Sequence, residues 1–430
     1  MKLEQLMEDV PFTLVQGTLE TEIEDIIYDS RKAAPGLLFV CIVGTQRDSH
    51  DFAADCVAKG VNTLVIQHDI DLSAMPDVNV IKVESSRYAM AKMSANLFGN
   101  PSRQMTMIGV TGTKGKTTTT HMIKSVLEAA GRKVGMIGTN GIYYMGCHKE
   151  TANTTPESYE LQKTFREFLD AGCDTALMEV SSQGLMMDRV AGVHYDVGVF
   201  TNLSPDHIGP GEHKTFEEYR SWKGQLFKRC DVGVVNIDDE NTEALLEGHT
   251  CKLVTYGRDE KADYRETGYE LLRTHDFLGV KFHVTGKDEM DVKVNMPGEF
   301  SVYNALPPWP WARCWACPMP PSMRVWASAW SRAAWSWCPS AKSSPSCWTT
   351  PTTRCPPRAC SPPCGLITPT GWWWCSAAAA TAPSCAATAW ARSAPRWRIS
   401  RSSPRTTTAL RKWKTSSRTF VWAWKKATQI

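Results

Sequence analysis

The stretch MTMIGVTGTKGKTTTT (Met105–Thr120) decides the fold of this chain. Its mainly apolar start predicts a buried strand, and the segment that follows (THMIKSVLEAAGR, 120–132) has the apolar spacing of a helix, with Gly131 near its end. Between them, Gly112 and Gly115 allow the backbone to bend so that its N–H groups face a phosphate. A strand, a glycine-rich turn and a helix in this order predict a phosphate-binding loop.

The residues of this loop also suit a nucleotide with its metal ion. Lys116 can reach the β- and γ-phosphates, Thr117 can place its hydroxyl on Mg²⁺, and the helix N-terminus adds positive potential. The strict pattern G-x-x-x-x-G-K-[ST] is not met, because its first glycine falls on Val110. The variant here is GTKGKTT, which consists of Gly112, Thr113, Lys114, Gly115, Lys116, Thr117 and Thr118. The alternative, a glycine turn with a surface lysine, is disfavoured by the strand before it and the helix after it.

Around the loop, strand and helix patterns alternate, which predicts a mainly parallel sheet and an α/β fold. The expected strands of residues 101–305 are 105–110, 133–139, 175–180, 195–202 and 231–238. Residues 1–100 are predicted to form a small α/β domain, with strands in GLLFVCIVG (36–44) and TLVIQ (63–67) and a helix in YAMAKMSANLFG (88–99). The paired Asp238 and Asp239 are interpreted as a turn at a strand end rather than as catalytic residues.

Composition divides the 430 residues into two unlike parts. Residues 1–305 carry a net charge of −14, whereas residues 306–430 carry +17 and contain no acidic residue, 16 of the 17 Trp, 9 of the 15 Cys and 17 of the 25 Pro. No apolar run reaches the ~20 residues of a membrane span. The start MKLEQLMEDVPF lacks the apolar core of a signal peptide, and scattered cysteines before residue 306 fit reduced thiols, so a cytoplasmic location is expected.

The loop GTKGKTT resembles the ATP loop of the Mur ligases, and further segments narrow the resemblance to the tripeptide synthetases of that family, the MurE type. The matching segments occur in family order over about 70% of the chain: YDSRKAAPGLLFVCIVG, NTTPES, MEVSSQGLMMDRV, TNLSPDHIGPGEHKTFEEYRSWKGQLF, VNIDD and PGEFSVYNAL. The resemblance implies an N-terminal UDP-MurNAc-binding domain (1–100), a central ATP-binding domain (101–305) and a third domain that would follow.

The resemblance assigns roles to the matching positions. Contacts to UDP-MurNAc-L-Ala-D-Glu are implied for Ser30, Arg31, Thr45, Gln46, Arg47, Asn153, Thr154, Thr155, Ser181 and Arg189. Asn304 matches the residue that contacts the adenine end of ATP. Glu179 and His207 match Mg²⁺ ligands beside Thr117, and Lys223 stands where the family carries a carbamylated lysine. Lys116, Glu179, His207 and Lys223 would together be the catalytic set. The alternative interpretation is that Glu179 is an exposed acid, His207 a loop residue and Lys223 a surface lysine.

The implied chemistry is the ligation of an amino acid to a carboxylate. A carboxylate is a poor acyl donor, so ATP first phosphorylates it, and the acyl phosphate is then attacked by an amine to give an amide, ADP and phosphate. Mg²⁺ and Lys116 would neutralise the anions that meet in this step. A plain ammonium at Lys223 would repel the metal ion, whereas a carbamate there would bind it. The expected protein is a monomer that binds neither nucleic acid nor membrane.

From Leu306 onward the resemblance stops, and we hypothesise that the remainder is the same gene read in a shifted frame. Joining the last base of each codon to the first two of the next allows WTTPTT to become DYAHNP and WWWCSAAAATAP to become VVVFGCGGDR, both close to family segments. The shifted frame also allows DNHR, near the family's diaminopimelate signature DNPR. The retained Arg would pair with the distal carboxylate, so meso-diaminopimelate is favoured over lysine. Residues 306–430 are then expected to be disordered or prone to aggregation, and the chain itself to be inactive in ligation.

Other interpretations remain open. A basic, tryptophan-rich tail could bind nucleic acid, and Cys314 and Cys317 have the spacing of a zinc knuckle, although the tail contains no His. Ligases of the folylpolyglutamate and cyanophycin types share the GTxGKT loop but should lack the DSR and NTTP segments. A non-catalytic nucleotide-binding protein is the alternative from another class. A carbamate on Lys223 would speak for an enzyme.

Overall fold

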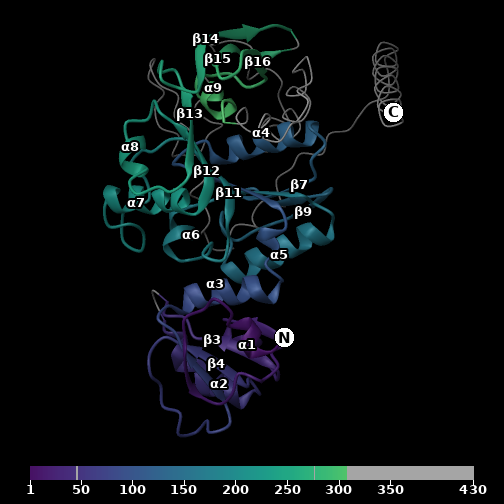
Figure 1. Ribbon diagram of the computed structural model, residues 1–430, viewed down its shortest axis with the longest axis vertical. Coiled ribbons are helices and arrows are strands. Elements are labelled where there is room, and N and C mark those ends of the chain that lie inside the picture. The colour runs from purple at the N-terminus through teal and green to yellow at the C-terminus, as the bar shows by residue number, and fades with distance from the viewer. Residues whose placement is uncertain (45–46, 276, 308–430) are drawn as a thin grey trace, which may run out of the picture. The chain divides into compact units, whose positions relative to one another are not determined.

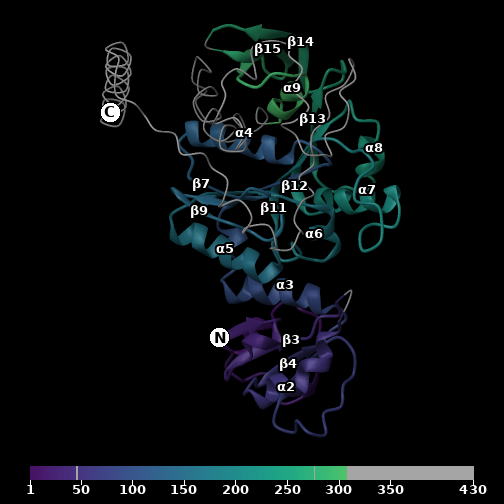
Figure 2. The same ribbon diagram turned by 180° about the vertical axis from the view of Figure 1, so that it is seen from behind.

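The computed structural model describes residues 1–44, 47–275 and 277–307. Within these ranges the chain forms one β-sheet of five strands and one of eleven strands. Figures 1 and 2 show the strands and helices of both sheets from opposite sides. Because each sheet carries helices and most of its strands are parallel, the predicted α/β class is confirmed.

The five-stranded sheet is formed by the first part of the chain, in the order β1-β5-β4-β3-β2. Neighbouring strands from β2 to β5 are parallel, and β1 pairs with β5 in the antiparallel sense. Its strands are β1 (Thr13–Gln16), β2 (Asp25–Ile27), β3 (Leu37–Val40), β4 (Thr63–Ile66) and β5 (Asn79–Lys82). Helices α1 (Leu3–Leu6), α2 (Ala53–Ala58) and α3 (Ser86–Leu97) accompany them. The strands predicted in 36–44 and 63–67 and the helix predicted in 88–99 are confirmed.

The eleven-stranded sheet has the order β16-β15-β14-β13-β12-β11-β6-β10-β7-β8-β9. Its parallel strands are β6 (Thr106–Thr111), β7 (Val134–Gly138), β10 (Thr175–Glu179), β11 (Tyr195–Phe200), β12 (Cys230–Asn236), β13 (Lys252–Gly257) and β14 (Tyr264–Arg273). Antiparallel strands extend both edges: β8 (Gly141–Tyr144), β9 (Cys147–Lys149), β15 (Leu278–Gly286) and β16 (Met290–Val294). The five predicted strands of this region are confirmed.

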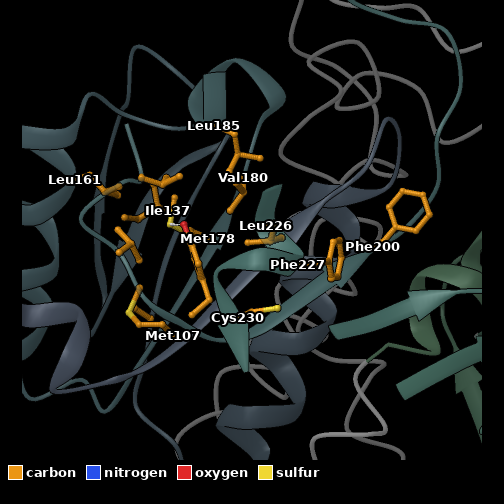
Figure 3. Packing of buried hydrophobic residues seen from close by; sticks show 14 of the residues in the cluster. Met107, Ile137, Leu161, Met178, Val180, Leu185, Phe200, Leu226, Phe227 and Cys230 are labelled. Atoms are coloured by element: carbon orange, nitrogen blue, oxygen red, sulfur yellow. Dashed lines mark hydrogen bonds between the residues drawn. The ribbon is translucent and has the colours of Figure 1, made fainter. Parts of the chain in front are cut away.

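Both faces of the central parallel strands β6, β7 and β10 are buried, and side chains alternate between the two faces. On β6, Met107 belongs to one apolar cluster, whereas Ile108 and Val110 belong to another. The first cluster, shown in Figure 3, receives Leu161, Phe165 and Phe168 from α5. The second cluster receives Met122, Ile123 and Leu127 from α4. A sheet covered on both faces leaves its strand ends as the place where polar loops can gather.

The helices of this part are α4 (Lys116–Ala129), α5 (Ser158–Asp170), α6 (Ser182–Met186), α7 (Phe216–Gly224), α8 (Thr242–Leu245) and α9 (Phe300–Ala305). Helix α4 begins four residues before the predicted segment, because Gly115 adopts a left-handed conformation at the N-cap and the threonines after it continue the helix. No helix in the described part of the chain is long and apolar enough to cross a membrane. The frame-shift hypothesis and the expected disorder concern residues 306–430, of which 308–430 lie outside the described residues.

Candidate nucleotide and metal site

The phosphate loop connects the carboxyl end of β6 to α4. Gly112 and Gly115 both have positive φ, of 143° and 84°, and each has a close neighbour on the side where a Cβ would be. A Cβ on Gly112 would overlap the hydroxyl of Thr201, and one on Gly115 would overlap the amide oxygen of Asn304. The backbone conformation therefore favours glycine at both positions, and a Cβ at either would have to displace a neighbouring side chain.

Residues that follow β11 hold the middle of the loop. The N–H groups of Thr113 and Lys114 donate to the backbone and side-chain oxygens of Asn202, at 2.8 and 2.9 Å. The carbonyl of Lys114 accepts bonds from Thr201 and Asn202. Two of the backbone donors expected to face a phosphate are thus used within the protein. The first turn of α4, which begins at Lys116, leaves N–H groups without intrahelical partners, and these are the donors that remain for an anion.

Two lysine side chains meet at one carbonyl of the loop. Nζ of Lys116 lies 2.9 Å from the carbonyl oxygen of Gly112, and Nζ of Lys223 lies 2.9 Å from the same oxygen. Lys223 is 2% exposed and its Nζ lies 4.6 Å from the ring centre of Tyr219. Burial and the nearby charge of Lys116 hold the pKa of Lys223 well below its usual range. Burial also lowers the pKa of Lys116, against the opposing pull of Glu179.

Glu179 is the last residue of β10 and is 1% exposed beside the loop. Its Oε1 accepts bonds from the Thr117 hydroxyl and the Thr139 N–H, both at 3.0 Å, and its Oε2 accepts from the Thr139 hydroxyl at 3.2 Å. Burial raises the pKa of Glu179, while Lys116 and these hydrogen bonds act in the opposite direction. The structure thus brings together the carboxylate and the hydroxyl that were predicted to bind a metal ion.

His207 lies on the loop after β11, near Tyr219 of α7. Its φ is 53°, its side chain is half exposed, and its Nδ1 lies 3.0 Å from Oε1 of Glu212. A hydrogen bond from Nδ1 to a carboxylate leaves Nε2 available as a metal ligand. The ring of His207 lies 6.2 Å from that of Tyr219, whose hydroxyl is 3.1 Å from the hydroxyl of Thr113.

These residues offer the oxygen and imidazole donors that a divalent cation would use. The carboxylate of Glu179 and the hydroxyl of Thr117 are hard oxygen ligands of the kind Mg²⁺ prefers. As an amine, Lys223 is a poor ligand for Mg²⁺, and it becomes an oxygen ligand only as a carbamate. The donor set present in the chain therefore fits Mg²⁺ through Thr117 and Glu179.

Predicted substrate residues that follow β9 and β10 form a hydrogen-bonded group around Glu179. The Thr155 hydroxyl donates to the backbone oxygen of Glu179 at 3.0 Å and lies 3.1 Å from the Ser181 hydroxyl, which caps α6. The Arg189 guanidinium bonds the backbone oxygen of Thr155 at 3.1 Å. Thr154 contacts the Thr139 hydroxyl at 3.0 Å. Asn153 is exposed on the same loop.

The predicted residues of the five-stranded sheet have separate partners. Ser30 begins a short 3₁₀ helix, and its backbone oxygen accepts from Lys59. Arg31 is exposed and pairs with Asp29 at 2.8 Å. Arg47 is exposed, and Thr45 and Gln46 lie outside the described residues. Across the described residues, no hydrogen bond or ion pair joins Ser30 or Arg31 to the phosphate loop.

A second group of possible metal ligands lies near this sheet, at Asp48, His50 and His68. The N–H of Gln67 donates to Nε2 of His50 at 2.9 Å, so the proton of this imidazole is on Nδ1, where it bonds Asp48 at 2.5 Å. Both ring nitrogens are therefore used. The hydrogen bond from His68 to Asp48, at 2.8 Å, raises the pKa of His68. The group is better described as a hydrogen-bonded cluster than as a metal site.

The site is completed by Asn304, which was predicted to contact ATP, and by several residues for which no role was predicted. The Thr119 hydroxyl donates to the Asn304 amide oxygen at 3.4 Å, which places Asn304 at the start of α4. Thr139, Asn202 and Tyr219 were not singled out from the sequence, although Asn202 and Tyr219 lie in segments used for the resemblance, and Asp239 was interpreted only as part of a turn at a strand end. Asp239 accepts the N–H of Leu203 at 2.7 Å and so ties the end of β12 to the end of β11. Thr139, Asn202 and Asp239 lie just after strands, which is the signal that the sequence offered for them, whereas Tyr219 lies within α7.

A glycine-rich loop between a parallel strand and a helix, with a buried carboxylate at the end of the adjacent strand, defines a nucleotide-binding domain of the P-loop class. The family model of the Mur ligase middle domain matches residues 110–307. This part of the chain belongs to the Mur ligase family.

Two curated ligases are similar in sequence to this chain over more than 300 residues. The chain is 38% identical over 311 residues to the UDP-N-acetylmuramoyl-L-alanyl-D-glutamate–2,6-diaminopimelate ligase of Clostridium perfringens, covering 71% of this chain and 63% of the relative. It is 42% identical over 307 residues to the first such ligase of Clostridium acetobutylicum, covering 71% of this chain and 62% of the relative. The chain thus spans less than two thirds of the length of these curated relatives.

Solved structures show the same fold. A structure of a UDP-N-acetylmuramoyl-L-alanyl-D-glutamate–2,6-diaminopimelate ligase matches with a TM-score of 0.63 at 23% identity, covering 72% of this chain and 62% of that chain. A crystal structure of MurF from Acinetobacter baumannii matches with a TM-score of 0.52 at 21% identity, covering 76% of this chain and 67% of that chain. At these identities the likeness concerns the fold.

Proposed function

We propose that this chain is the N-terminal and central part of an ATP-dependent ligase that adds meso-diaminopimelate to UDP-MurNAc-L-Ala-D-Glu in peptidoglycan synthesis. The observation that carries the proposal is the meeting of the Thr117 hydroxyl and the buried Glu179 carboxylate at the phosphate loop, with Lys116 and Lys223 on the neighbouring carbonyl of Gly112. The relatives named above are ligases of this activity. A lysine-adding ligase is the alternative choice of amino acid.

The reaction joins two substrates through an acyl phosphate. The carboxylate of the dipeptide attacks the γ-phosphorus of ATP, which releases ADP. The amine of the incoming amino acid then attacks the acyl carbon, and the loss of phosphate and of a proton from the nitrogen leaves an amide. Lys116 would place its positive charge beside the phosphates during the first step. ATP use also accords with a MurF ligase of Thermotoga maritima solved with ADP, which shares the fold at a TM-score of 0.50.

Thr117, Glu179, His207 and a carbamylated Lys223 would hold Mg²⁺, which when bound supplies positive charge to the phosphate oxygens. The environment of Lys223 favours the carbamate. Its lowered pKa favours the neutral amine, the form that would attack CO₂ and lose a proton to give the carbamate anion. An anion next to Lys116 replaces repulsion between two lysines by attraction.

The other binding roles follow the two sheets. Residues 1–100 would form the UDP-MurNAc-binding domain, with Ser30, Arg31, Thr45, Gln46 and Arg47 as its contacts, and residues 101–305 the ATP-binding domain. Asn153, Thr154, Thr155, Ser181 and Arg189 would hold the muramoyl dipeptide near Glu179. We expect a monomer in the cytoplasm.

We assign the binding site for the incoming amino acid to the segment that the shifted frame would encode after residue 306. The family match ends at residue 307, next to the expected break. We therefore expect the 430-residue chain to bind nucleotide without ligating its substrates. DNA sequencing across codons 300–312 tests the frame slip, and an intact frame that continues into residues 306–430 would contradict it.

The activity test compares two proteins. The 430-residue chain and a version from a gene with the frame restored are each given the dipeptide substrate, ATP, Mg²⁺ and diaminopimelate, and phosphate release is followed. We expect turnover only from the restored protein, with its loss in a Lys223→Ala variant and partial recovery by small carboxylic acids. Lysine in place of diaminopimelate tests the alternative substrate. A restored protein that binds nucleotide but does not turn over would favour a non-catalytic role.

A further inference from the structure

Helix α9 brings Asn304 to the phosphate loop, although the helix has little stability of its own. It spans only Phe300–Ala305, and its N-cap residue Glu299 makes no side-chain capping bond. Helices of this length do not form alone in water. Figure 1 shows α9 near α4, and the two helices are in contact. What holds α9 therefore also decides where the amide of Asn304 lies.

One side of α9 is held by apolar packing. Val302, Ala305 and Leu306 are fully buried in the cluster that also contains α4 residues. Such packing is not directional, because apolar contacts tolerate small rotations of a short helix. The rotation of α9 about its axis needs a directional contact.

The bond from Thr119 to Asn304 is long, at 3.4 Å, and a shorter directional contact comes from Tyr303, the residue next to Asn304. Its hydroxyl donates to Oδ2 of Asp238 at 2.9 Å. The guanidinium of Arg258 lies 5.3 Å from the Tyr303 ring centre and also pairs with Glu299, at the start of the helix. A charged carboxylate and a cation thus hold the polar side of α9 at two points, one of them adjacent to Asn304.

Asp238 is itself firmly placed. Its carboxylate accepts the N–H groups of Arg258 at 2.6 Å and Asp259 at 3.0 Å. A Cβ on Gly257 would lie 2.6 Å from Oδ1 of Asp238, so only glycine lets the carboxylate approach the end of β13 this closely. Asp238 therefore connects the ends of β12 and β13 to α9.

We propose that Asp238 and Tyr303 are positioning residues for the nucleotide: their hydrogen bond sets the rotation of α9 and thereby the position of Asn304 at the start of α4. The inference rests on the proposed function, because it assumes that Asn304 contacts ATP. It gives the Asp-Asp pair after β12 a role other than that of a simple turn.

The test measures the affinity of the 430-residue chain for a fluorescent ADP analogue in Tyr303→Phe, Asn304→Ala and the double variant. We expect Tyr303→Phe to weaken binding about 3- to 10-fold, the range of one lost hydrogen bond. Because Tyr303 acts through Asn304, it should have little further effect when Asn304 is already Ala. The matched control is Tyr159→Phe, which removes a tyrosine hydroxyl bonded to Asp25 at 2.8 Å and should bind normally.

The outcomes separate this inference from the proposed function. Unchanged affinity in Tyr303→Phe, or the same loss with and without the Asn304 side chain, would overturn the positioning role while leaving nucleotide binding intact. A wild-type chain that does not bind the analogue would overturn the proposed function and this inference with it. Thermal melting of each variant by circular dichroism checks that the Tyr303→Phe protein is folded.

Discussion

Replacing Gly115 with Ala tests the geometry of the phosphate loop most directly. Gly115 has a φ of 84° at the N-cap of α4, and the Asn304 amide occupies the space that a Cβ would need. The same helix supplies a matched control. Gly131, just beyond its other end, also has a φ of 84°, but no atom lies within 4 Å of its Cβ position. The two substitutions share one backbone strain and differ in one steric contact.

The expected loss of stability is the sum of the backbone strain and the steric contact. An alanine in the left-handed region costs about 1–2 kcal/mol, which is the whole expected effect at Gly131. At Gly115 the new methyl group must also displace the Asn304 side chain, whose Cγ would lie 3.3 Å away. Overpacking of this kind costs about 1–3 kcal/mol. Gly115→Ala should therefore destabilise by about 2–5 kcal/mol and exceed Gly131→Ala by about 1–3 kcal/mol.

Hydrogen exchange of the α4 amides is the suitable assay, because it reports the opening of this helix in the full chain. Tryptophan fluorescence would report mainly on residues 306–430, which hold 16 of the 17 Trp. In an Asn304→Ala background, Gly115→Ala should lose the steric term, so its added cost should be close to that of Gly131→Ala. Equal costs of the two single substitutions, or no relief in the double variant, would refute the placement of Asn304 against Gly115.

Three further predictions concern named polar groups. Glu179→Gln should stabilise the chain at neutral pH, because burial raises the pKa of Glu179. The contribution of Glu179 to stability is complete below the ordinary pKa of 4.5 and is lost as the pH rises. The difference in thermal midpoint between the variant and the wild type should therefore narrow in acid, and a constant difference would contradict this. Asp48→Asn should return the raised pKa of His68 towards 6.5 in an NMR titration, and an unchanged titration would remove Asp48 as the cause. Thr139→Val, which deletes the hydroxyl between Glu179 and Thr154, should cost about 0.5–1.5 kcal/mol in denaturant unfolding; no loss would mean that water replaces it.

The sequence predicted the phosphate loop and five of the seven parallel strands of the larger sheet, but not β13 and β14. These predictions succeeded because they depend on local patterns. The apolar run 105–110 and the glycines after it carry their own signal, and β6 and the loop lie where they were expected. Contacts between distant segments carry no local signal. The bond from Thr139 to Glu179, 40 residues apart, and the meeting of Lys116 and Lys223 at Gly112 follow from strand order, which the sequence alone did not give.

The pair of lysines also supports the proposal that this loop binds an anion. Two amines share one carbonyl oxygen, and burial lowers the pKa of both. The buried carboxylate of Glu179 favours the charged form of Lys116, whereas Asp206 is the acidic group that favours the charged form of Lys223. A phosphate at the start of α4 would favour the charged form of Lys116, and a carbamate would convert Lys223 into a partner for it. Ligand binding and lysine modification should therefore strengthen one another, since each reduces the electrostatic cost of the other.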